Sequence, residues 1–289
     1  MVLENGVNSI FLFCVIEKTG NLTLQGHYDL QGFFCCVIFK ISLITIMTDT
    51  KEKLDKTKNK EDFKLDLDEM MKAGLHFGHR TSRIHPKMMP YLQGVKNTVH
   101  FISLEKTAEK LAEALKFIQE LISQGKILLL VGTKIQIKNM VKEMAIDYGL
   151  PYVSERWLGG TFTNLGIIKK RVEYFKNLEK QRDSGELEKY TKKERIKISQ
   201  ELKNLEIKFG GIKNLEKLPD AIFILDMKKD YLAAKEAREM GVRVIGISDT
   251  NIDPTLADFP IPANDDAISS VKYILDKVKE VIIKAKPKK

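Results

Sequence analysis

The chain contains, at residues 126–132, the continuous apolar run Lys-Ile-Leu-Leu-Leu-Val-Gly. A strand that is buried on both faces has this pattern, because neither face has to carry polar side chains. Helical spacing precedes the run over residues 105–124 and follows it over residues 135–148, where Gly149 marks the helix end. The region is therefore predicted to be a buried strand between two helices.

The same alternation continues to the end of the chain. Further strands are predicted at residues 151–153, 221–225 and 242–247 and near Ile261, and further helices at residues 230–240 and 265–284. Alternation of this kind predicts an α/β domain, with a parallel sheet, helices on both faces and right-handed crossovers. It leaves the order of the strands open.

A highly charged segment, residues 164–209, interrupts this α/β pattern. Its apolar residues recur at steps of three and four, which is typical of the narrow seam of a coiled coil; they are Ile168, Val172, Phe175, Ile198, Leu202, Leu205 and Phe209. Asp183-Ser184-Gly185 indicates a turn, and Thr191 with Glu194 has capping-box spacing. We expect an inserted coiled-coil helical hairpin whose arms are each about 27 Å long at 1.5 Å per residue.

The predicted organisation places the hairpin inside one domain. The α/β domain comprises residues 65–163 and 210–284 and begins with a short amphipathic helix from Leu65 to Ala73, closed by Gly74. Residues 47–64 have mixed charge and few apolar side chains, so a flexible charged arm is expected. Residues 285–289 form a basic tail that is expected to be mobile.

The first 46 residues differ from everything that follows. They hold only five charged side chains and all three cysteines of the chain. The apolar run at 33–46 is shorter than the ~20 residues of a membrane span, and the segment lacks the marks of a signal or transit peptide. Because a polar segment starts abruptly at Met47, we expect translation to begin there and residues 1–46 to be a non-native extension; a genuine leader or anchor is the alternative.

Charge favours a polyanionic partner. The formal net charge is +9, and the hairpin supplies about half of it, roughly +5. A positive excess of this kind favours nucleic acid, although a salt-bridged, solvated coiled coil is the alternative for the hairpin. The chain beyond residue 46 contains no cysteine, so it has no disulfide framework or thiolate metal site, in keeping with a reducing, cytosolic setting.

The carboxyl ends of the predicted strands carry possible catalytic groups. Asp226 and Asp249 could form a carboxylate pair, with Lys134 as a phosphate contact, in an enzyme that acts on phosphorylated small molecules. The preferred interpretation is that the acids cap helices and that Lys134 faces solvent. Neither a Walker loop nor a dinucleotide fingerprint is present, and Gly210-Gly211 follows a helix as a C-cap and breaker.

Residues 76–88 concentrate histidines and cations. His76, His79 and His85 could bind a metal, but Gly78 and Pro86 favour a loop, and no cysteine assists. On a loop, imidazole and guanidinium groups can instead stack on bases and contact phosphates of RNA. We expect no metal and no cofactor.

Several segments together resemble the bacterial small-subunit ribosomal protein two family. The resemblance covers about residues 65–280 in unbroken order and is carried by residues 76–88, 97–107, 131–134, 156–164, 210–213, 218–221, 249–251 and 263–268. The chain departs from the family pattern at Ile84-His85, where Trp-Asn is frequent, at Arg80, where Gln is common, and at Met227, where Pro is usual.

The resemblance implies a flavodoxin-like α/β domain with an inserted coiled-coil hairpin. It also implies a non-catalytic constituent of the cytoplasmic small ribosomal subunit that binds 16S rRNA and neighbouring ribosomal proteins and helps to recruit ribosomal protein one. No membrane and no small-molecule substrate are expected.

Eleven cations are the candidate rRNA contacts, because Lys and Arg side chains can neutralise phosphates and release counterions. They are Arg80, Arg83, Lys87, Lys96, Arg156, Lys169, Lys170, Arg171, Lys192, Lys193 and Arg195. Trp157 is expected to anchor the core beneath the Gly159-Gly160 loop rather than to stack on a base.

Overall fold

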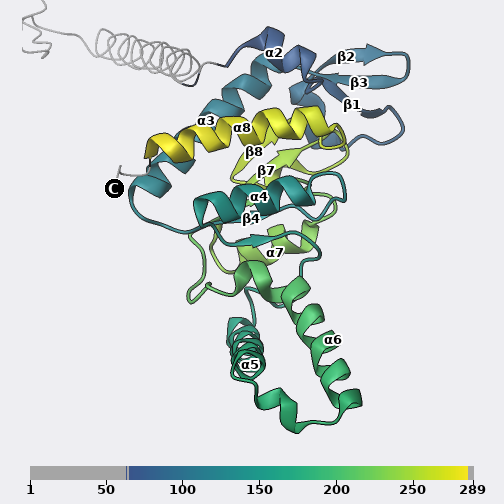
Figure 1. Cartoon of the computed structure of the whole chain (residues 1–289). Coiled ribbons are helices and arrows are strands. Elements are labelled where there is room, and N and C mark those ends of the chain that lie inside the picture. The colour runs from purple at the N-terminus through teal and green to yellow at the C-terminus, as the bar shows by residue number, and fades with distance from the viewer. Residues whose placement is uncertain (1–62, 64, 286–289) are drawn as a thin grey trace, which may run out of the picture. The chain divides into compact units, whose positions relative to one another are not determined.

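The computed structural model describes Phe63 and residues 65–285 (Figure 1). The chain divides into two units, Met1–Leu54 and Asp55–Lys289, and all described residues belong to the second. The predictions for residues 1–46, for most of the arm at 47–64 and for residues 286–289 lie outside the described residues. Phe63, placed in the arm by the sequence, is buried in the core.

A five-stranded parallel sheet forms the centre of the described unit, as predicted. Its order is β5-β4-β6-β7-β8, which is the flavodoxin-like order 2-1-3-4-5 when counting starts at β4. The strands are β4 (Leu128–Val131), β5 (Tyr152–Val153), β6 (Ala221–Ile224), β7 (Arg243–Ser248) and β8 (Phe259–Pro262). Every residue of β4 and β6 is buried, which explains their unbroken apolar sequences.

Alternate strand residues build two separate cores. Leu128 and Phe223 pack with helices α3 (Leu104–Ser123), α4 (Lys138–Tyr148) and α8 (Ile268–Ala285). Leu129 and Ile222 face the other way and pack with α7 (Tyr231–Glu239) and with the apolar residues of the hairpin. The hairpin therefore shares a core with one face of the sheet.

Two helices begin three residues later than the sequence predicts. Helix α4 starts at Lys138 rather than Ile135, whose side chain is 78% exposed. Helix α8 starts at Ile268 rather than Asp265, because the Asn264 side chain accepts hydrogen bonds from the amides of Asp266 and Ala267. That Asx turn holds the preceding loop out of the helix.

The prediction of a loop over residues 76–88 is wrong in part. After α2 (Leu67–Lys72), strands β1 (Phe77–Arg80), β3 (Val99–Ile102) and β2 (Leu92–Lys96) form a small antiparallel sheet, with a 3₁₀ helix, η1 (Pro86–Tyr91), between β1 and β2. Gly78 lies within β1, at a position where Thr250 approaches closely. A Cβ there would stand 2.5 Å from Thr250 Cγ2, so a larger residue would not fit. The glycine permits close packing and does not mark a loop.

The inserted segment consists of α5 (Leu165–Asp183), the 3₁₀ helix η2 (Glu186–Lys189) and α6 (Lys192–Phe209). The predicted capping box of Thr191 and Glu194 is present. Val172 and Phe175 of α5 and Leu202 of α6 are buried, as is Leu178, which the predicted seam omitted. Helices α5 and α6 contact each other. That they supercoil around each other as a coiled coil remains a prediction.

A strained turn joins β2 to β3. Asn97 and Thr98 have φ values of 49° and 62°, and Thr98 is exposed. The left-handed conformation is unfavourable for a β-branched residue, and two-residue hairpins of this type prefer Asn-Gly. Thr98→Gly is therefore expected to raise the free energy of unfolding by about 0.5–1 kcal/mol in urea denaturation. Asn97→Gly should change it less, and a loss of stability in Thr98→Gly would contradict the assigned turn.

Candidate nucleic-acid interface

The carboxyl edge of the parallel sheet carries a closed network of charges. Lys134 follows β4, and its Nζ lies 3.5 Å from Asp226 Oδ2, 3.2 Å from Asp265 Oδ1 and 2.6 Å from Asp266 Oδ1. The Lys134 side chain is 16% exposed, so the expectation that it faces solvent is wrong. Because three carboxylates hold it, the enzyme alternative loses its phosphate contact.

The electrostatics of this edge follow from its burial. Burial alone would lower the pKa of Lys134, but the hydrogen bond to Asp266 and the charges of Asp265 and Asp226 raise it above its ordinary value. Burial and the neighbouring charges of Asp226 and Asp249 raise the pKa of Asp265 to about 7. In this network the positive charge of Lys134 compensates part of the negative charge of the surrounding aspartates, which outnumber it.

The three histidines of residues 76–88 do not come together. His79 Nδ1 lies 3.0 Å from Asp249 Oδ2, and this hydrogen bond raises the pKa of His79. His76 packs against aromatic rings, 4.0 Å from Phe77 between centroids, and His85 accepts from the Lys87 amide at the start of η1. The metal alternative built on the three histidines therefore has no common ligand position. Among the described residues, ligand atoms within 4.8 Å of one another are found on His79, Asp249 and Asp266.

Asp230 is a buried acid that precedes α7 and accepts a hydrogen bond from Thr133 Oγ1 at 3.0 Å. Burial, with a contribution from the charge of Asp226, raises the pKa of Asp230 to about 6. Since the unfolded value is near 3.9, the folded state holds this proton more tightly, and its contribution to stability is lost as the pH rises through about 6.

The free energy of unfolding of Asp230→Asn should therefore rise, relative to that of the unchanged protein, by about 2 kcal/mol as the pH is raised from 4 to 7. Urea denaturation across that range measures the difference. The exposed Asp147→Asn is the control and should show no comparable drift. A constant difference between Asp230→Asn and the parent would contradict the raised pKa.

All eleven candidate cations are exposed. Lys87 alone among them pairs with a described carboxylate, at 2.6 Å from Asp253 Oδ2, and it also donates to Thr255 Oγ1. The other ten have no ion pair with any acid in the described part of the chain. Unpaired surface cations are available to neutralise an external polyanion.

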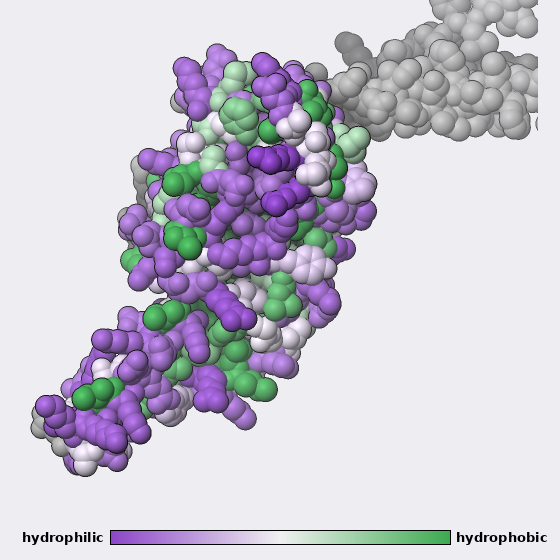
Figure 2. Space-filling view, turned by 90° about the vertical axis from the view of Figure 1, so that its right-hand side faces the viewer, coloured by the Kyte–Doolittle hydropathy of each residue, from purple (hydrophilic) through white to green (hydrophobic). Residues whose placement is uncertain are grey.

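These cations fall into three groups by the elements that carry them, and Figure 1 shows where those elements lie. Arg80, Arg83, Lys87 and Lys96 belong to the region of the small antiparallel sheet. Arg156, Lys169, Lys170 and Arg171 lie where the chain enters α5, at the base of the hairpin. Lys192, Lys193 and Arg195 lie at the start of α6, near the hairpin tip. In Figure 2, hydrophilic residues cover most of the visible face, and apolar ones gather where the hairpin joins the body.

A buried carboxylate fixes the entrance to the hairpin. Glu236 of α7 is 5% exposed and accepts hydrogen bonds from Gly160 N at 2.8 Å, Phe162 N at 3.1 Å and Trp157 Nε1 at 3.4 Å. Trp157 is itself buried and meets Phe162 edge to face, which confirms its predicted role in the core. The loop that carries Arg156 is thereby held to α7.

The sequence did not single out Glu236. Only the position of Glu236 in the helix could have indicated that it is buried, because it lies on the side of α7 that also buries Ala233 and Ala237. A charged residue among buried alanines requires a specific set of partners.

Close packing fixes the exit from the hairpin. Gly211, in the 3₁₀ turn η3 (Gly210–Ile212) that follows α6, packs so tightly that a Cβ would collide with the carbonyl oxygen of Tyr152 in β5. Gly210 has φ −53° and ψ −43°, so it ends α6 in a right-handed conformation. Gly210 is therefore the C-cap of α6, as predicted, and Gly211 alone permits the close approach of η3 to the sheet.

Among the helices of the described residues, none combines the length and the apolar character that a bilayer span requires.

Comparison with known proteins identifies the family. The family model described as "Ribosomal protein S2" matches residues 70–285. The curated protein "Small ribosomal subunit protein uS2" of Dictyoglomus thermophilum is 43% identical over 220 residues, which are 76% of this chain and 89% of that relative. Together with the flavodoxin-like sheet order, these matches confirm the resemblance inferred from the sequence. The chain belongs to the ribosomal protein S2 family.

Proposed function

We propose that this protein binds small-subunit (16S) rRNA through its exposed Lys and Arg side chains, as a scaffold in which no bond is made or broken. Membership of the family makes the chain a structural, non-enzymatic constituent of the small subunit of the cytoplasmic ribosome. The observation that carries the proposal is the exposure of all eleven candidate cations, ten of them without an acidic partner in the described chain.

The arrangement of these cations suits binding to more than one RNA segment. An 18-residue helix is about 27 Å long, so the base and the tip of the hairpin are too far apart to contact one phosphate group. The α/β body and the hairpin tip would therefore bind different parts of the rRNA, and each phosphate contact would release counterions.

Ribosomal protein one is the proposed protein partner. The proposal rests on the family resemblance inferred from the sequence. Small subunits depleted of this protein are expected to lose ribosomal protein one, and adding the protein back should restore it. Normal retention of ribosomal protein one by depleted subunits would contradict this part of the proposal.

Arg83 and Lys87 offer a matched comparison within residues 76–88. Both are exposed cations, but Asp253 already neutralises Lys87. Arg83→Ala is expected to weaken rRNA binding about threefold to tenfold at physiological salt, and Lys87→Ala less than twofold. Filter binding with purified small-subunit rRNA measures both, and a larger effect of Lys87→Ala would contradict the assignment of free and paired cations.

Sedimentation tests the proposed function as a whole. In a gradient of a cell lysate at low salt, the protein should travel with small subunits and move to the soluble fractions as salt is raised. Recovery only at the top of the gradient at every salt concentration would contradict the proposal.

A further inference from the structure

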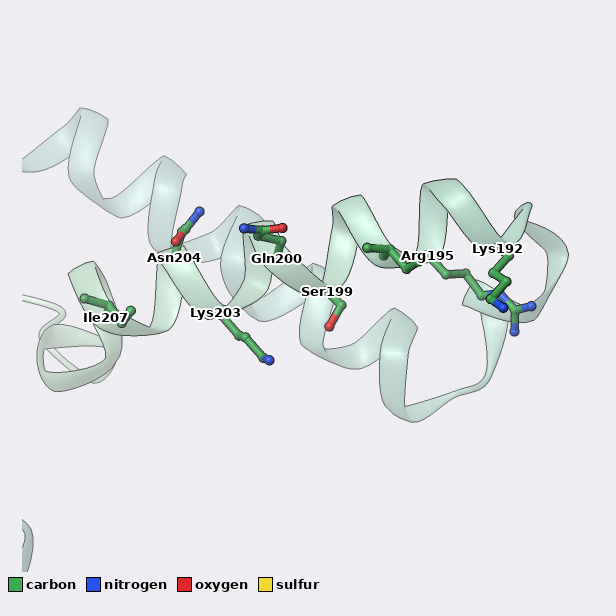
Figure 3. A pocket seen from close by; sticks show the side chains of 8 residues that line it. Lys192, Arg195, Ser199, Gln200, Lys203, Asn204 and Ile207 are labelled. Carbon is green, nitrogen blue, oxygen red and sulfur yellow. The ribbon is translucent and has the colours of Figure 1, made fainter.

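A polar cavity of about 320 Å³ lies where the chain leaves the hairpin, and we call it the exit cavity. Its lining comes from α4, from β5 with the two residues that follow it, from the last turn of α6 and from Gly211 of η3. Figure 3 shows a different hollow, an open groove whose lining from Lys192 to Ile207 belongs to α6 alone. Unlike that groove, the exit cavity brings together side chains that are far apart in the sequence, as small-molecule sites do.

The charges of the exit cavity do not cancel. Lys138 Nζ lies 3.0 Å and 3.3 Å from the two carboxylate oxygens of Glu155, so these two residues neutralise each other. Lys142, one helical turn after Lys138, and Lys208 of α6 are exposed and form no ion pair with any acid among the described residues. The second acid of the lining, Glu206, likewise has no cationic partner in the described part of the chain. The cavity therefore presents two free ammonium groups and one free carboxylate.

Neutral polar groups complete the lining. Asn139 of α4 and Ser154, which follows β5, make no side-chain hydrogen bond with another residue that the structure describes. Tyr152 is half-buried, and burial together with the nearby charge of Glu206 raises its pKa. The Glu206 carboxylate thus lies close to the phenol, where it can accept hydrogen bonds from the hydroxyl groups of a ligand.

We propose that the exit cavity binds a small phosphorylated sugar, such as a sugar phosphate or a nucleoside monophosphate, which is held and not converted. Lys142 and Lys208 would bind the phosphate group from two different helices, through charge-assisted hydrogen bonds. Glu206 would accept hydrogen bonds from the sugar hydroxyls, and Asn139 and Ser154 can donate to either part of the ligand. The single positive charge that remains suits a ligand with one or two negative charges.

The size of the cavity limits the ligand further. Small-molecule sites have volumes of roughly 300–1,000 Å³, and the exit cavity is at the lower end of this range. One sugar phosphate fits such a volume, whereas a nucleic-acid duplex or a protein helix would stay outside. Because α4 and β5 belong to the α/β body and α6 to the hairpin, a ligand that contacts both sides would fasten the hairpin to the body.

Isothermal titration calorimetry of the full-length protein with ribose 5-phosphate tests the inference. Saturable binding of one ligand per chain is expected. Ribose and inorganic phosphate, each alone, should bind about tenfold more weakly or less, because each makes only part of the contacts. The midpoint of thermal unfolding should rise by about 5–10 °C when ribose 5-phosphate is present at about a hundred times its Kd.

A matched pair of double variants assigns the binding to the exit cavity. Lys142→Ala/Lys208→Ala removes the two free cations of the cavity, and Lys197→Ala/Lys203→Ala removes two exposed cations of α6 outside it. Circular dichroism verifies that both variants remain folded, since alanine supports a helix at each position. The affinity for ribose 5-phosphate should fall about tenfold or more in the cavity variant and less than about twofold in the control variant.

Glu206→Gln separates the contacts of the sugar from those of the phosphate. It should weaken the binding of ribose 5-phosphate by about threefold to tenfold, because the hydroxyl groups lose a charged acceptor. The binding of inorganic phosphate should not weaken, since a neighbouring negative charge has been removed. Equal weakening of both ligands would contradict the role of Glu206.

Absence of saturable binding of ribose 5-phosphate at millimolar concentration, or equal losses in the cavity and control variants, would overturn the inference. If the cavity variant lost affinity for purified small-subunit rRNA and free ribose 5-phosphate did not bind, the cavity would belong to a nucleotide of the rRNA instead. The proposed function is tested independently, because the unchanged protein can bind rRNA whether or not the exit cavity holds a free ligand.

Discussion

Glu236→Gln is expected to lower the free energy of unfolding by about 3 kcal/mol, although the two side chains have nearly the same shape. One carboxylate oxygen of Glu236 serves Gly160 N and Trp157 Nε1, and the other serves Phe162 N. Glutamine turns one acceptor into an NH₂ group that faces a buried N–H, so at least one donor loses its partner. Urea denaturation at pH 7 measures the loss.

Glu239→Gln provides the control, because Glu239 is exposed on the same helix. Its effect should stay within about 0.5 kcal/mol, as for most surface substitutions. If Glu236→Gln were as stable as the parent, the carboxylate would not be the group that holds the Trp157–Phe162 loop.

Gly211→Ala should also cost about 3 kcal/mol or more, for a steric reason. The added Cβ would collide with the Tyr152 carbonyl oxygen and stand 2.9 Å from both Tyr152 C and Cδ2. Relief requires the backbone of η3 or β5 to move, because a carbonyl group cannot rotate away as a flexible side chain can. Thermal and urea denaturation should both detect the change.

The preceding glycine should respond in the opposite direction. A Cβ on Gly210 would meet Glu206 Cγ at 3.7 Å, an ordinary contact, and the backbone there is right-handed helical. Gly210→Ala should therefore gain about 0.5–1 kcal/mol, because alanine lowers the entropy of the unfolded chain. Equal losses in both variants would contradict the packing of η3 against β5.

These two positions share a consequence for function. Glu236 fixes the chain as it enters the hairpin, and Gly211 fixes it as it leaves. A hairpin attached at both ends would present the cations of its tip at a set distance from those of the body. Both variants are therefore expected to weaken rRNA binding without removing any cation.

The sequence predicted the parallel sheet well because its signals are local. Strands such as β4 and β6 are buried on both faces, and short, unbroken apolar runs are typical of such strands. The two hairpin helices were similarly evident from their seam residues, their turn and the capping box. Boundaries were less accurate where a side chain such as Asn264 redirects the backbone.

The small antiparallel sheet was missed because its strands lack a readable alternation. β1 contains Gly78, whose presence depends on Thr250, a residue far away in sequence. Lys134 was misjudged for the same reason, since its partners Asp226, Asp265 and Asp266 come from distant loops. The candidate cations are exposed, as charged side chains usually are, but only the structure shows that Lys87 is paired with Asp253.

The salt dependence of binding tests most directly whether this protein holds rRNA by its unpaired cations. The full-length protein is titrated with purified small-subunit rRNA at salt concentrations between about 50 and 200 mM. If at least five of the ten unpaired cations contact phosphates, log affinity should fall linearly with log salt at a slope of about −4 or steeper. Tight binding with a slope near zero, or no binding at low salt, would contradict the account.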